Sequence, residues 1–320
     1  MMLKKALGSL PKTAEGLIEM NFKELSKFID NIGREYNVPC YDICIYYNHV
    51  NVFSRKRGFS DFRHRIKAAG RNLYFIHSGA KIMCCVGLMR LIQSYKASLN
   101  DSVCGYLPDM SGDIKIRDMI TGYSAAAHDD DKVFCFNNML RLIEAISGEV
   151  FEEFMDREII KPLKMRSTSF RLTDKSKKRM ALQYRFDGGG LVEYETDAKT
   201  IAEQNNGCII TSVDDYARFC EAICSGGTAA NGYRLLNRES VDILINELVY
   251  KETEKDGAFV CIGYHGGLVL IDVKKKITIV YAQYVKNMPV EQLEMYPKLR
   301  KLAYECIGAD TWSMGYNMFP

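Results

Sequence analysis

The sequence predicts an α/β (α+β) protein with one antiparallel sheet, terminal helices that flank the sheet, and an inserted helical lobe. Strand-like segments occur near both ends of the chain, at 41–55 and 268–284, whereas helical patterns fill the middle. Amphipathic segments at 21–36 and 290–307 lie outside these strands in the sequence. The simplest packing pairs the terminal strands in one sheet and places both terminal helices on one face of it.

The same patterns predict how the 320 residues divide into lobes. We expect residues 1–75 and 230–320 to form the α/β sheet lobe, and residues 76–229 to form the inserted helical lobe. A chain of this length suffices for one large domain or two closely packed subdomains. Because ligand sites favour such a seam, we expect the functional site between the two lobes.

The first helix and a hairpin follow from residues near the start of the chain. Apolar residues recur at helical spacing in 21–36, and Asn21 is suited to begin the helix. The segment Tyr41–Tyr47 is rich in strand-forming residues. Asn48-His49 then predicts a tight turn, after which Val50–Arg55 returns as a second strand.

The rest of the chain alternates helical patterns with one late pair of strands. The segment after Ser78 is strongly apolar, and Gly148 and Gly226-Gly227 are placed to end two of the later helices. We expect helices at 81–95, 116–121, 138–147, 151–160, 214–224 and 290–307, and strands at 268–272 and 277–284.

Composition excludes several classes of protein. Hydrophobic residues make up 47% of the chain, and a net charge of +3 is too small to indicate nucleic-acid binding. No run of 18 apolar residues predicts a membrane-spanning helix. The 11 cysteines include no Cys-x-x-Cys pair, and we recognise no export signal. We therefore expect reduced thiols, no disulfides and a cytoplasmic protein.

The residues that indicate chemistry begin at Ser78 and Lys81, which form a Ser-x-x-Lys motif at the start of a predicted buried helix. A spacing of three places both side chains on one helix face, one turn apart. A serine hydroxyl needs a neighbouring base to become a nucleophile, and a lysine in an apolar setting can act as that base. The motif alone occurs often by chance, so its context decides.

That context resembles the serine β-lactamase and penicillin-binding-protein superfamily, nearest to its class C β-lactamase and esterase-like branch. The resemblance runs from about Val38 to Tyr284 and rests on the shared order of several short motifs. These are Gly58-Phe59-Ser60-Asp61, Tyr74 through Lys81, Leu99 through Pro108, Ile116 through Thr121, Pro162 through Thr168, and Ser212 through Gly227. The resemblance implies a β-lactamase-like fold with Ser78 as nucleophile and Lys81 as its base.

The resemblance also implies a substrate-binding set. The second motif, Tyr-x-Asn, falls on Phe136-Asn137-Asn138, where Phe136 lacks the hydroxyl that shuttles protons. Phe136 is equally well explained by core packing, and Tyr123 could supply a substitute hydroxyl. The third motif, Lys-Thr-Gly or His-x-Gly on a strand, falls best on His265-Gly266-Gly267. His265 is only seven residues from Asp272, where the family usually has a longer stretch, so the strand or its loop is shortened in this chain. The family geometry then implies an oxyanion hole formed by the backbone N–H groups of Ser78 and Leu268.

Other candidate sites fail on spacing. The histidines form no metal-ligand pattern, and adjacent residues such as His128-Asp129-Asp130-Asp131 cannot all point at one ion. Gly188-Gly189-Gly190 has no following Lys-Ser/Thr pair, so it predicts a loop and not a phosphate cradle. We expect no metal and no cofactor.

Three hypotheses of function remain, of which the third is a slow acylating enzyme of the same fold, such as a transferase or peptidase. The first is a serine hydrolase that acts on an ester, amide or β-lactam-like carbonyl of a small-molecule or peptide-like acyl substrate. The second is a catalytically impaired relative that keeps the fold and binds a ligand or partner, which the substitution at Phe136 favours. We expect no nucleic-acid or membrane partner, and the sequence does not indicate the oligomeric state.

Overall fold

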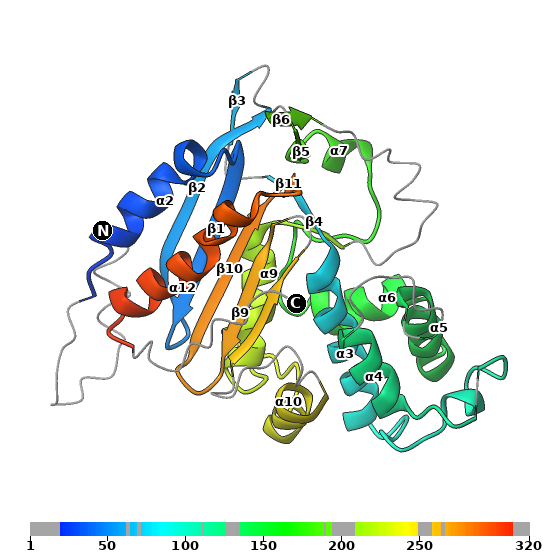
Figure 1. Cartoon of the computed structure of the whole chain (residues 1–320). Coiled ribbons are helices and arrows are strands. Elements are labelled where there is room, and N and C mark those ends of the chain that lie inside the picture. The colour runs from blue at the N-terminus through cyan, green and yellow to red at the C-terminus, as the bar shows by residue number, and fades with distance from the viewer. Residues whose placement is uncertain are drawn as a thin grey trace, which may run out of the picture.

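A computed structural model of the chain describes residues 20–61, 65–68, 72–110, 112–125, 133, 135–188, 190–193, 209–248, 258–263 and 266–309. At its centre lies a six-stranded antiparallel sheet in the order β3-β2-β1-β10-β9-β8 (Figure 1). Its strands, in that order, are Ile66–Lys67, Val50–Asp61, Cys40–Tyr47, Ile277–Gln283, Leu268–Asp272 and Ala258–Ile262.

The predicted hairpin and the predicted single sheet are both confirmed. Strands β1 and β2 are joined at Asn48 and His49, whose φ angles of 47° and 68° give the left-handed turn that suits a two-residue hairpin. Strand β1 also pairs along its length with β10, with Ile43 opposite Tyr281. Strands from the early and the late part of the chain therefore pair at the centre of one sheet.

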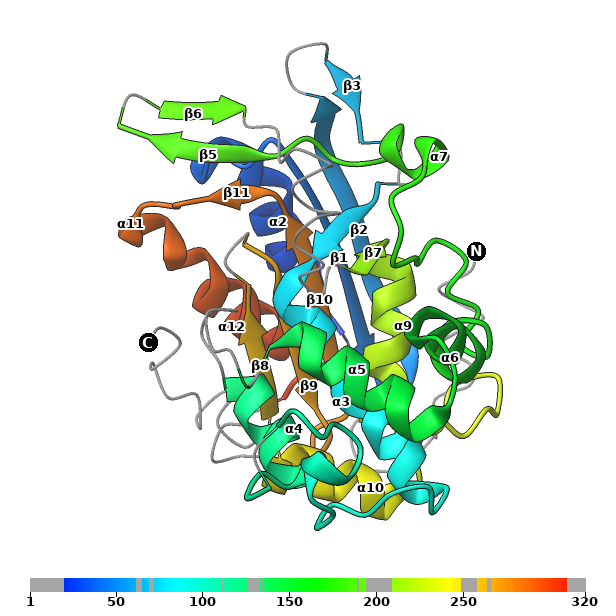
Figure 2. The same cartoon turned by 90° about the vertical axis from the view of Figure 1, so that its right-hand side faces the viewer.

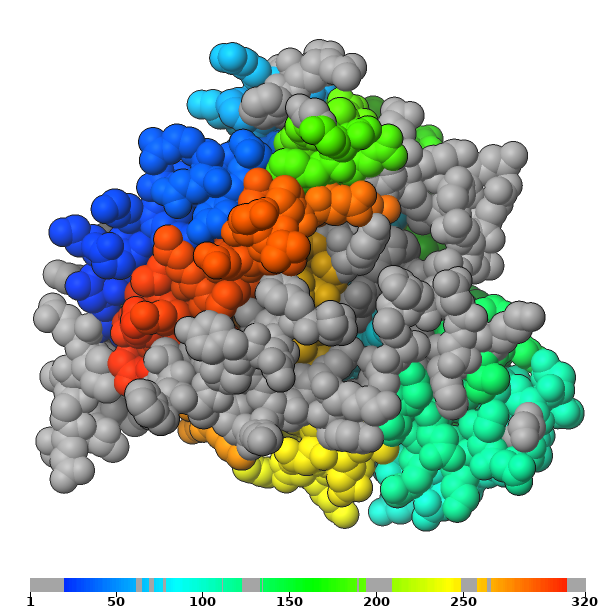
Figure 3. Space-filling model, in the orientation of Figure 1, coloured from blue at the N-terminus to red at the C-terminus, as the bar shows by residue number. Residues whose placement is uncertain are grey.

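Helices α2 (Lys23–Glu35) and α12 (Met295–Cys306) cover one face of this sheet, as predicted (Figure 1). The short helix α11 (Val290–Leu293) precedes α12. The core beneath them is almost entirely aliphatic and aromatic, and includes Leu25, Ile29, Ile43, Ile279 and Leu299. In the space-filling view, α2 and α12 form one side of the molecule, in blue and red (Figure 3).

The other face carries helix α9 (Val213–Cys224) and, beyond it, the helical lobe (Figure 2). Ser212 begins α9 and accepts a hydrogen bond from the Asp215 N–H. The lobe contains α3 (His77–Gln93), α4 (Ile116–Ala125), α5 (Phe136–Ser147) and α6 (Phe151–Met155). Gly148, with φ at 75°, ends α5 in the left-handed conformation, as its place in the sequence predicts.

Two segments make contacts across the lobe boundaries that we expected, which stay a prediction. Helix α9 falls within 76–229, yet it packs on β1, β9 and β10. Helix α10 (Arg238–Ile243) continues into a π-helical turn, η3 (Leu244–Leu248), which falls within 230–320 but packs on α3 and α4. Both segments have an apolar face, and an apolar face does not specify which neighbour covers it.

Two smaller sheets lie beside the central six-stranded sheet. Strand β4 (Tyr74–Ile76) pairs with β7 (Ile209–Thr211), and β5 (Tyr184–Asp187) pairs with both β6 (Gly190–Glu193) and β11 (Val285–Lys286). The remaining short elements are a 3₁₀ turn η1 (Val103–Gly105), a π-helical turn η2 (Asp156–Ile160) and helix α7 (Asp174–Lys177). Strand β4 matters most for function, because it leads directly into α3.

The cysteines and the helices bear on two further expectations. Ten cysteines lie in the described residues and none of these is in a disulfide; Cys208 lies outside the described ranges. Among the described helices, none combines the length and the apolar character needed to cross a membrane.

Candidate active site

The predicted nucleophile and base lie at the beginning of α3. Strand β4 ends at Ile76, and α3 begins at His77, so Ser78 occupies the first turn and Lys81 the next. The side chain of Ser78 lies outside the described part of the structure, whereas that of Lys81 is half-buried. The helix backbone therefore sets the two residues one turn apart on one face.

Gly79, next to Ser78, allows the start of α3 to pack closely on its surroundings. A Cβ at this position would lie 2.2 Å from Ile76 Cγ2 and 2.8 Å from the Tyr216 hydroxyl oxygen. That hydroxyl donates a hydrogen bond of 2.6 Å to the Gly79 carbonyl. Helix α9, which carries Tyr216, thereby fixes the first turn of α3 against the sheet.

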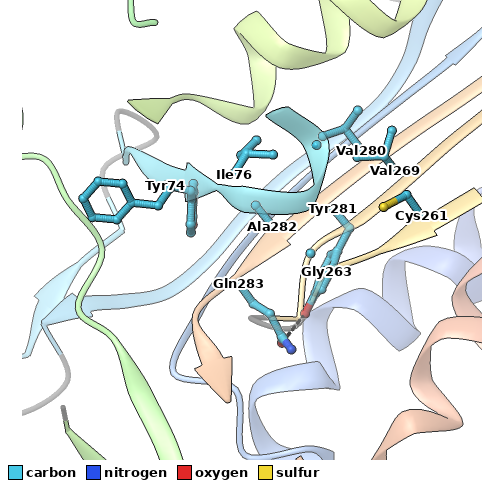
Figure 4. A pocket seen from close by; sticks show the side chains of 12 residues that line it. Tyr74, Ile76, Cys261, Gly263, Val269, Val280, Tyr281, Ala282 and Gln283 are labelled. Atoms are coloured by element: carbon cyan, nitrogen blue, oxygen red, sulfur yellow. Dashed lines mark hydrogen bonds between the residues drawn. The ribbon is translucent and has the colours of Figure 1, made fainter. Parts of the chain in front are cut away.

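A small hollow opens between the start of α3 and the end of the sheet (Figure 4). Strand β4 and α3 form one side through Tyr74, Phe75, Ile76 and Gly79. Strands β8, β9 and β10 and the glycines between β8 and β9 form the other side through Cys261, Gly263, Gly267, Val269, Val280, Tyr281, Ala282 and Gln283. No Lys, Arg, Asp or Glu lies among these lining residues, so the described walls are mainly apolar. Ile76 and Gly79 flank Ser78 in the sequence, which places the hollow beside the predicted nucleophile.

Strand β4 is attached to the sheet by Tyr284, just after β10. The Tyr284 hydroxyl accepts a hydrogen bond from the Phe75 N–H. Its ring centroid lies 5.7 Å from that of Tyr74 and 6.3 Å from that of Phe75. This contact fixes one wall of the hollow to the other.

A buried polar cluster lies behind β4. Asp42 of β1 is 1% exposed, and its Oδ1 has no hydrogen-bond partner within the described residues. Burial raises the pKa of Asp42 to about 7; Lys56 lowers it and Asp214 raises it further. The Tyr74 hydroxyl lies 3.5 Å from the Cys40 thiol in the same cluster. One polar region thus contacts the strand that leads to Ser78.

The second-motif residues Phe136 and Asn138 lie in the first turn of α5. Phe136 is 6% exposed, and its ring packs edge-on against Phe151, with centroids 5.5 Å apart. The Asn138 amide donates to the Val133 carbonyl at 3.0 Å, and its oxygen accepts from Arg141 at 3.2 Å. These contacts fit core packing of Phe136 and a structural use of Asn138, and the described lining of the hollow includes neither. Tyr123 lies in α4, and its side chain lies outside the described part of the structure.

The third motif falls on the connection between β8 and β9. His265 itself lies outside the described residues, but the glycines around it are described. The Gly266 N–H donates to the Gly263 carbonyl at 2.8 Å, and the Gly263 N–H donates to the Gly267 carbonyl at 2.8 Å. Gly267 lines the hollow, and its role in substrate binding stays a prediction.

Leu268 begins β9, an inner strand, where it is fully buried and lies opposite both Ile262 and Tyr281. Hydrogen-bonded and non-hydrogen-bonded pairs alternate along an antiparallel ladder. Since Gly263 bonds to Gly267, the adjacent Ile262–Leu268 pair is a non-hydrogen-bonded one. The Leu268 N–H is therefore directed toward β10, and the outward N–H groups at this edge of the sheet belong to β8.

Sequence reasoning missed β8, although it forms this edge. The run Ala258–Ile262 is apolar and rich in strand formers, with Gly257 before it and Gly263 after it, which is the usual signature of a buried strand. Gln283 and Tyr296, which contact the connection between β8 and β9, carried no sequence signal of their own.

Comparison with known proteins gives the family. A family model described as Beta-lactamase matches residues 25–133 and 136–283, so the chain belongs to the beta-lactamase family. Among curated proteins, it is 20% identical over 207 residues to Protein flp of Staphylococcus aureus (strain N315). That match covers 52% of this chain and 42% of the relative, so the chain spans less than half the length of the curated relatives that it matches.

Solved structures share the fold at low sequence identity. A mutant of simvastatin synthase from Aspergillus terreus has a TM-score of 0.75 and 12% identity, covering 93% of this chain and 100% of that chain. The hydrolase EstCE1, described as having promiscuous acyltransferase activity, has a TM-score of 0.73 and 13% identity, covering 88% and 98%. D-amino acid amidase from Ochrobactrum anthropi has a TM-score of 0.66 and 14% identity, covering 89% and 99%. The predicted β-lactamase-like fold is confirmed.

Proposed function

We propose that this chain is a serine hydrolase that acts on an ester, amide or β-lactam-like carbonyl through an acyl-serine intermediate at Ser78. One observation carries the proposal: the helix turn with Ser78 and Lys81 borders a hollow between the sheet and the helical lobe. The hydrolase and acyltransferase activities of EstCE1 and the amidase activity of the Ochrobactrum anthropi enzyme support acyl transfer as the reaction class.

In the first half of the reaction, Lys81 accepts the proton of the Ser78 hydroxyl while the oxygen attacks the substrate carbonyl carbon. A tetrahedral intermediate forms, and its oxygen carries the negative charge. The bond to the leaving group then breaks, and the leaving alcohol or amine takes the proton. In the second half, water attacks the acyl-serine ester, releasing the acid and restoring the Ser78 hydroxyl.

The oxyanion needs donors that are already in place. The Ser78 N–H at the start of α3 is one donor. For the other we now propose the Ile262 N–H of β8 in place of Leu268, because the ladder alternation directs Ile262 out of the sheet edge. Asn138, His265, Gly267, Phe136 and Tyr123 remain proposed substrate-binding residues.

The lining of the hollow supports a choice among substrates. Since its described walls carry no charged side chain, an uncharged acyl group of a small molecule or peptide fits better than one with a carboxylate there. The reacting carbonyl would lie beside Ile76 and Gly79, and the acyl chain would extend toward Val269 and Val280.

The test is covalent labelling with a fluorophosphonate probe, read by mass spectrometry of the modified peptide. We expect one adduct on Ser78, loss of labelling in Ser78→Ala, and strongly slowed labelling in Lys81→Ala. Ser94→Ala, in the residue that follows α3, is the matched control and should be labelled like the wild type. An adduct elsewhere, or equal labelling of Ser78→Ala, would contradict the assignment.

A second candidate is a ligand-binding protein without turnover, and the packing of Phe136 and Asn138 supports it. Both residues are engaged within the helical lobe, and Phe136 has no hydroxyl to transfer a proton. This hypothesis predicts a folded wild-type protein that the probe does not label, but whose thermal unfolding temperature rises with a ligand that fills the hollow.

A further inference from the structure

The connection between β8 and β9 rests directly on a buried glutamine. Gly266 has a φ of 85°, and a Cβ at this position would lie 2.1 Å from Gln283 Nε2. Gln283 is the last residue of β10 and is 2% exposed. The Gly266 backbone therefore packs on the Gln283 amide as closely as glycine allows.

A chain of hydrogen bonds continues from that amide. The Tyr281 hydroxyl donates to Gln283 Oε1 at 2.9 Å, which is the dashed contact in Figure 4. Gln283 Nε2 donates to the Tyr296 hydroxyl oxygen at 3.1 Å and also contacts Met288 Sδ at 2.9 Å. The Tyr296 hydroxyl in turn donates to the Gly266 carbonyl at 2.9 Å. Helix α12 is thereby connected through β10 to the edge of the hollow.

Only one arrangement of hydrogens satisfies this chain. A backbone carbonyl can only accept, so the single hydrogen of Tyr296 points to Gly266, and its oxygen must accept from Gln283. The Gln283 carbonyl is then left to accept from Tyr281. Burial raises the pKa of Tyr281 and that of Tyr296 well above the usual range for a phenol, so both hydroxyls keep their hydrogen.

We propose that Gln283 and Tyr296 are positioning residues that hold Gly266 and Gly267, at the end of the β8–β9 connection, in place across the hollow from the start of α3. The structural part of this inference stands on the hydrogen bonds alone, whereas its consequence for catalysis rests on the proposed function. Gly263 and Gly267, at the ends of the connection, line the hollow opposite Ile76 and Gly79. A shift of this connection changes the distance between the edge of β8 and Ser78.

Loss of the anchor should lower the rate of acylation more than substrate binding. The outward N–H groups of β8 face the developing oxyanion, so their misplacement weakens the transition state selectively. The apolar walls formed by Val269 and Val280 stay in place because they belong to the interior of strands.

Two tyrosines on α12 provide a matched pair of variants. Tyr296 and Tyr304 are both buried, and each donates one hydrogen bond to a group at one end of β9: Tyr296 to Gly266 before the strand, and Tyr304 to Asp272 at its end, at 2.9 Å. Tyr296→Phe and Tyr304→Phe therefore remove the same hydroxyl from the same helix. Only the first removes a contact at the hollow.

The first measurement is hydrogen exchange of backbone amides, which needs no activity. We expect Tyr296→Phe to accelerate exchange in the peptide spanning 258–267, and Tyr304→Phe to leave that peptide unchanged. Equal exchange in both variants would overturn the inference. Gly266→Ala displaces the connection without removing a hydroxyl, so it should also accelerate exchange in the peptide spanning 258–267. This variant replaces Tyr296→Phe in the test if Tyr296→Phe does not fold.

The second measurement is the rate of fluorophosphonate labelling at Ser78. We expect Tyr296→Phe to lower the rate constant of inactivation about tenfold to a hundredfold with little change in apparent affinity, and Tyr304→Phe to change it less than about twofold. Equal losses in both would mean a general effect of stability and would refute the positioning role. If the wild type is not labelled but exchange responds to Tyr296→Phe, the proposed function fails while the anchor stands.

Discussion

The two faces of the central sheet receive different residues from the same strands. In β1, Ile43 and Ile45 belong to the apolar core beneath α2 and α12. Successive side chains of a strand point to opposite faces, so Asp42 and Cys44 face the other way. There the sheet contacts β4 and α9, and the contacts include a thiol and a carboxyl group.

This difference between the two faces suggests that one mainly stabilises the fold and that the other mainly positions the neighbouring elements. Around Ile43 and Ile279, the face beneath α2 and α12 has only to exclude water, and apolar packing does this most effectively. The hydrogen bonds of Tyr281, Gln283 and Tyr296 lie at one end of this face, where it meets the hollow. The opposite face must also fix β4, α9 and the start of α3 in defined places, which directional hydrogen bonds achieve at some loss of stability. Substitutions on the two faces of one strand should therefore differ in the kind of effect as well as in its size.

The largest expected effect is on the apolar face. Ile43→Ala removes a fully buried side chain and leaves a cavity, so the free energy of unfolding should fall by about 2–5 kcal/mol. Denaturant unfolding followed by circular dichroism measures it. A loss below about 1 kcal/mol would mean that the core collapses around the cavity and that this face is less rigid than its packing indicates.

The next effect is the pH dependence caused by Asp42 on the other face. Its pKa in the folded state is about 7, above the ordinary value of 3.8, so folding favours the protonated acid. The contribution of this group to stability is complete below about pH 4 and is lost as the pH rises through 7. Asp42→Asn cannot ionise and should therefore be more stable than the wild type above pH 7, by up to roughly 4 kcal/mol.

Unfolding curves of the wild type and Asp42→Asn between pH 4 and pH 8 would measure this difference. The two proteins should diverge as the pH rises, with Asp187→Asn, at an exposed position in β5, following the wild type throughout. Parallel curves for Asp42→Asn and the wild type would mean that Asp42 stays ionised in the folded protein.

A smaller effect is expected where β10 meets α9. Thr278 is fully buried, and its hydroxyl donates to Glu221 Oε2 at 3.1 Å. Glu221 is also contacted by His49 Nδ1 at 2.7 Å, so Thr278→Val removes one of its partners and not all of them. We expect a loss of about 1–3 kcal/mol in thermal or denaturant unfolding. Unchanged stability would show that water or His49 replaces the hydroxyl.

The smallest effect is expected at Ile279, which follows Thr278 in β10 and lies on the apolar face. Ile279→Val removes one methylene from the core beneath α2 and α12 and should lower the free energy of unfolding by about 0.5–1.5 kcal/mol. Measured together with Thr278→Val, it compares adjacent residues of one strand. If Ile279→Val costs more than Thr278→Val, the polar contacts contribute less to stability than we infer.

The elements that the sequence predicted well are those whose pattern is local. The run of strand-forming residues in β1, the turn at Asn48-His49 and the helical spacing in α2 each depend on neighbouring residues, and all three were confirmed. Strand β8 was missed because a five-residue apolar run by itself does not distinguish a strand from part of a helix, and only the flanking Gly257 and Gly263 identify it as a strand.

The site was less predictable, because its parts meet only in three dimensions. The spacing of Ser78 and Lys81 is local, and the helix that carries both was predicted, although it begins earlier than expected. The direction of the Leu268 N–H depends on how β9 pairs with its two neighbouring strands. The contact of Gln283 with Gly266 forms only because the connection between β8 and β9 approaches the end of β10 in three dimensions. Neither feature follows from the periodicity of apolar residues that predicts helices and strands.

The pairing of β1 with β10 has a consequence for how the chain acquires its fold. Ile43 lies opposite Tyr281, although most of the chain separates them. Contacts between residues distant in sequence slow folding, because a long loop must close before the pairing forms. During synthesis, the hairpin of β1 and β2 leaves the ribosome long before its partner strand. Until β10 arrives, one edge of β1 is unpaired, and that edge is a site for pairing with other chains. We therefore expect the yield of folded protein to be sensitive to chaperones that shield the early hairpin.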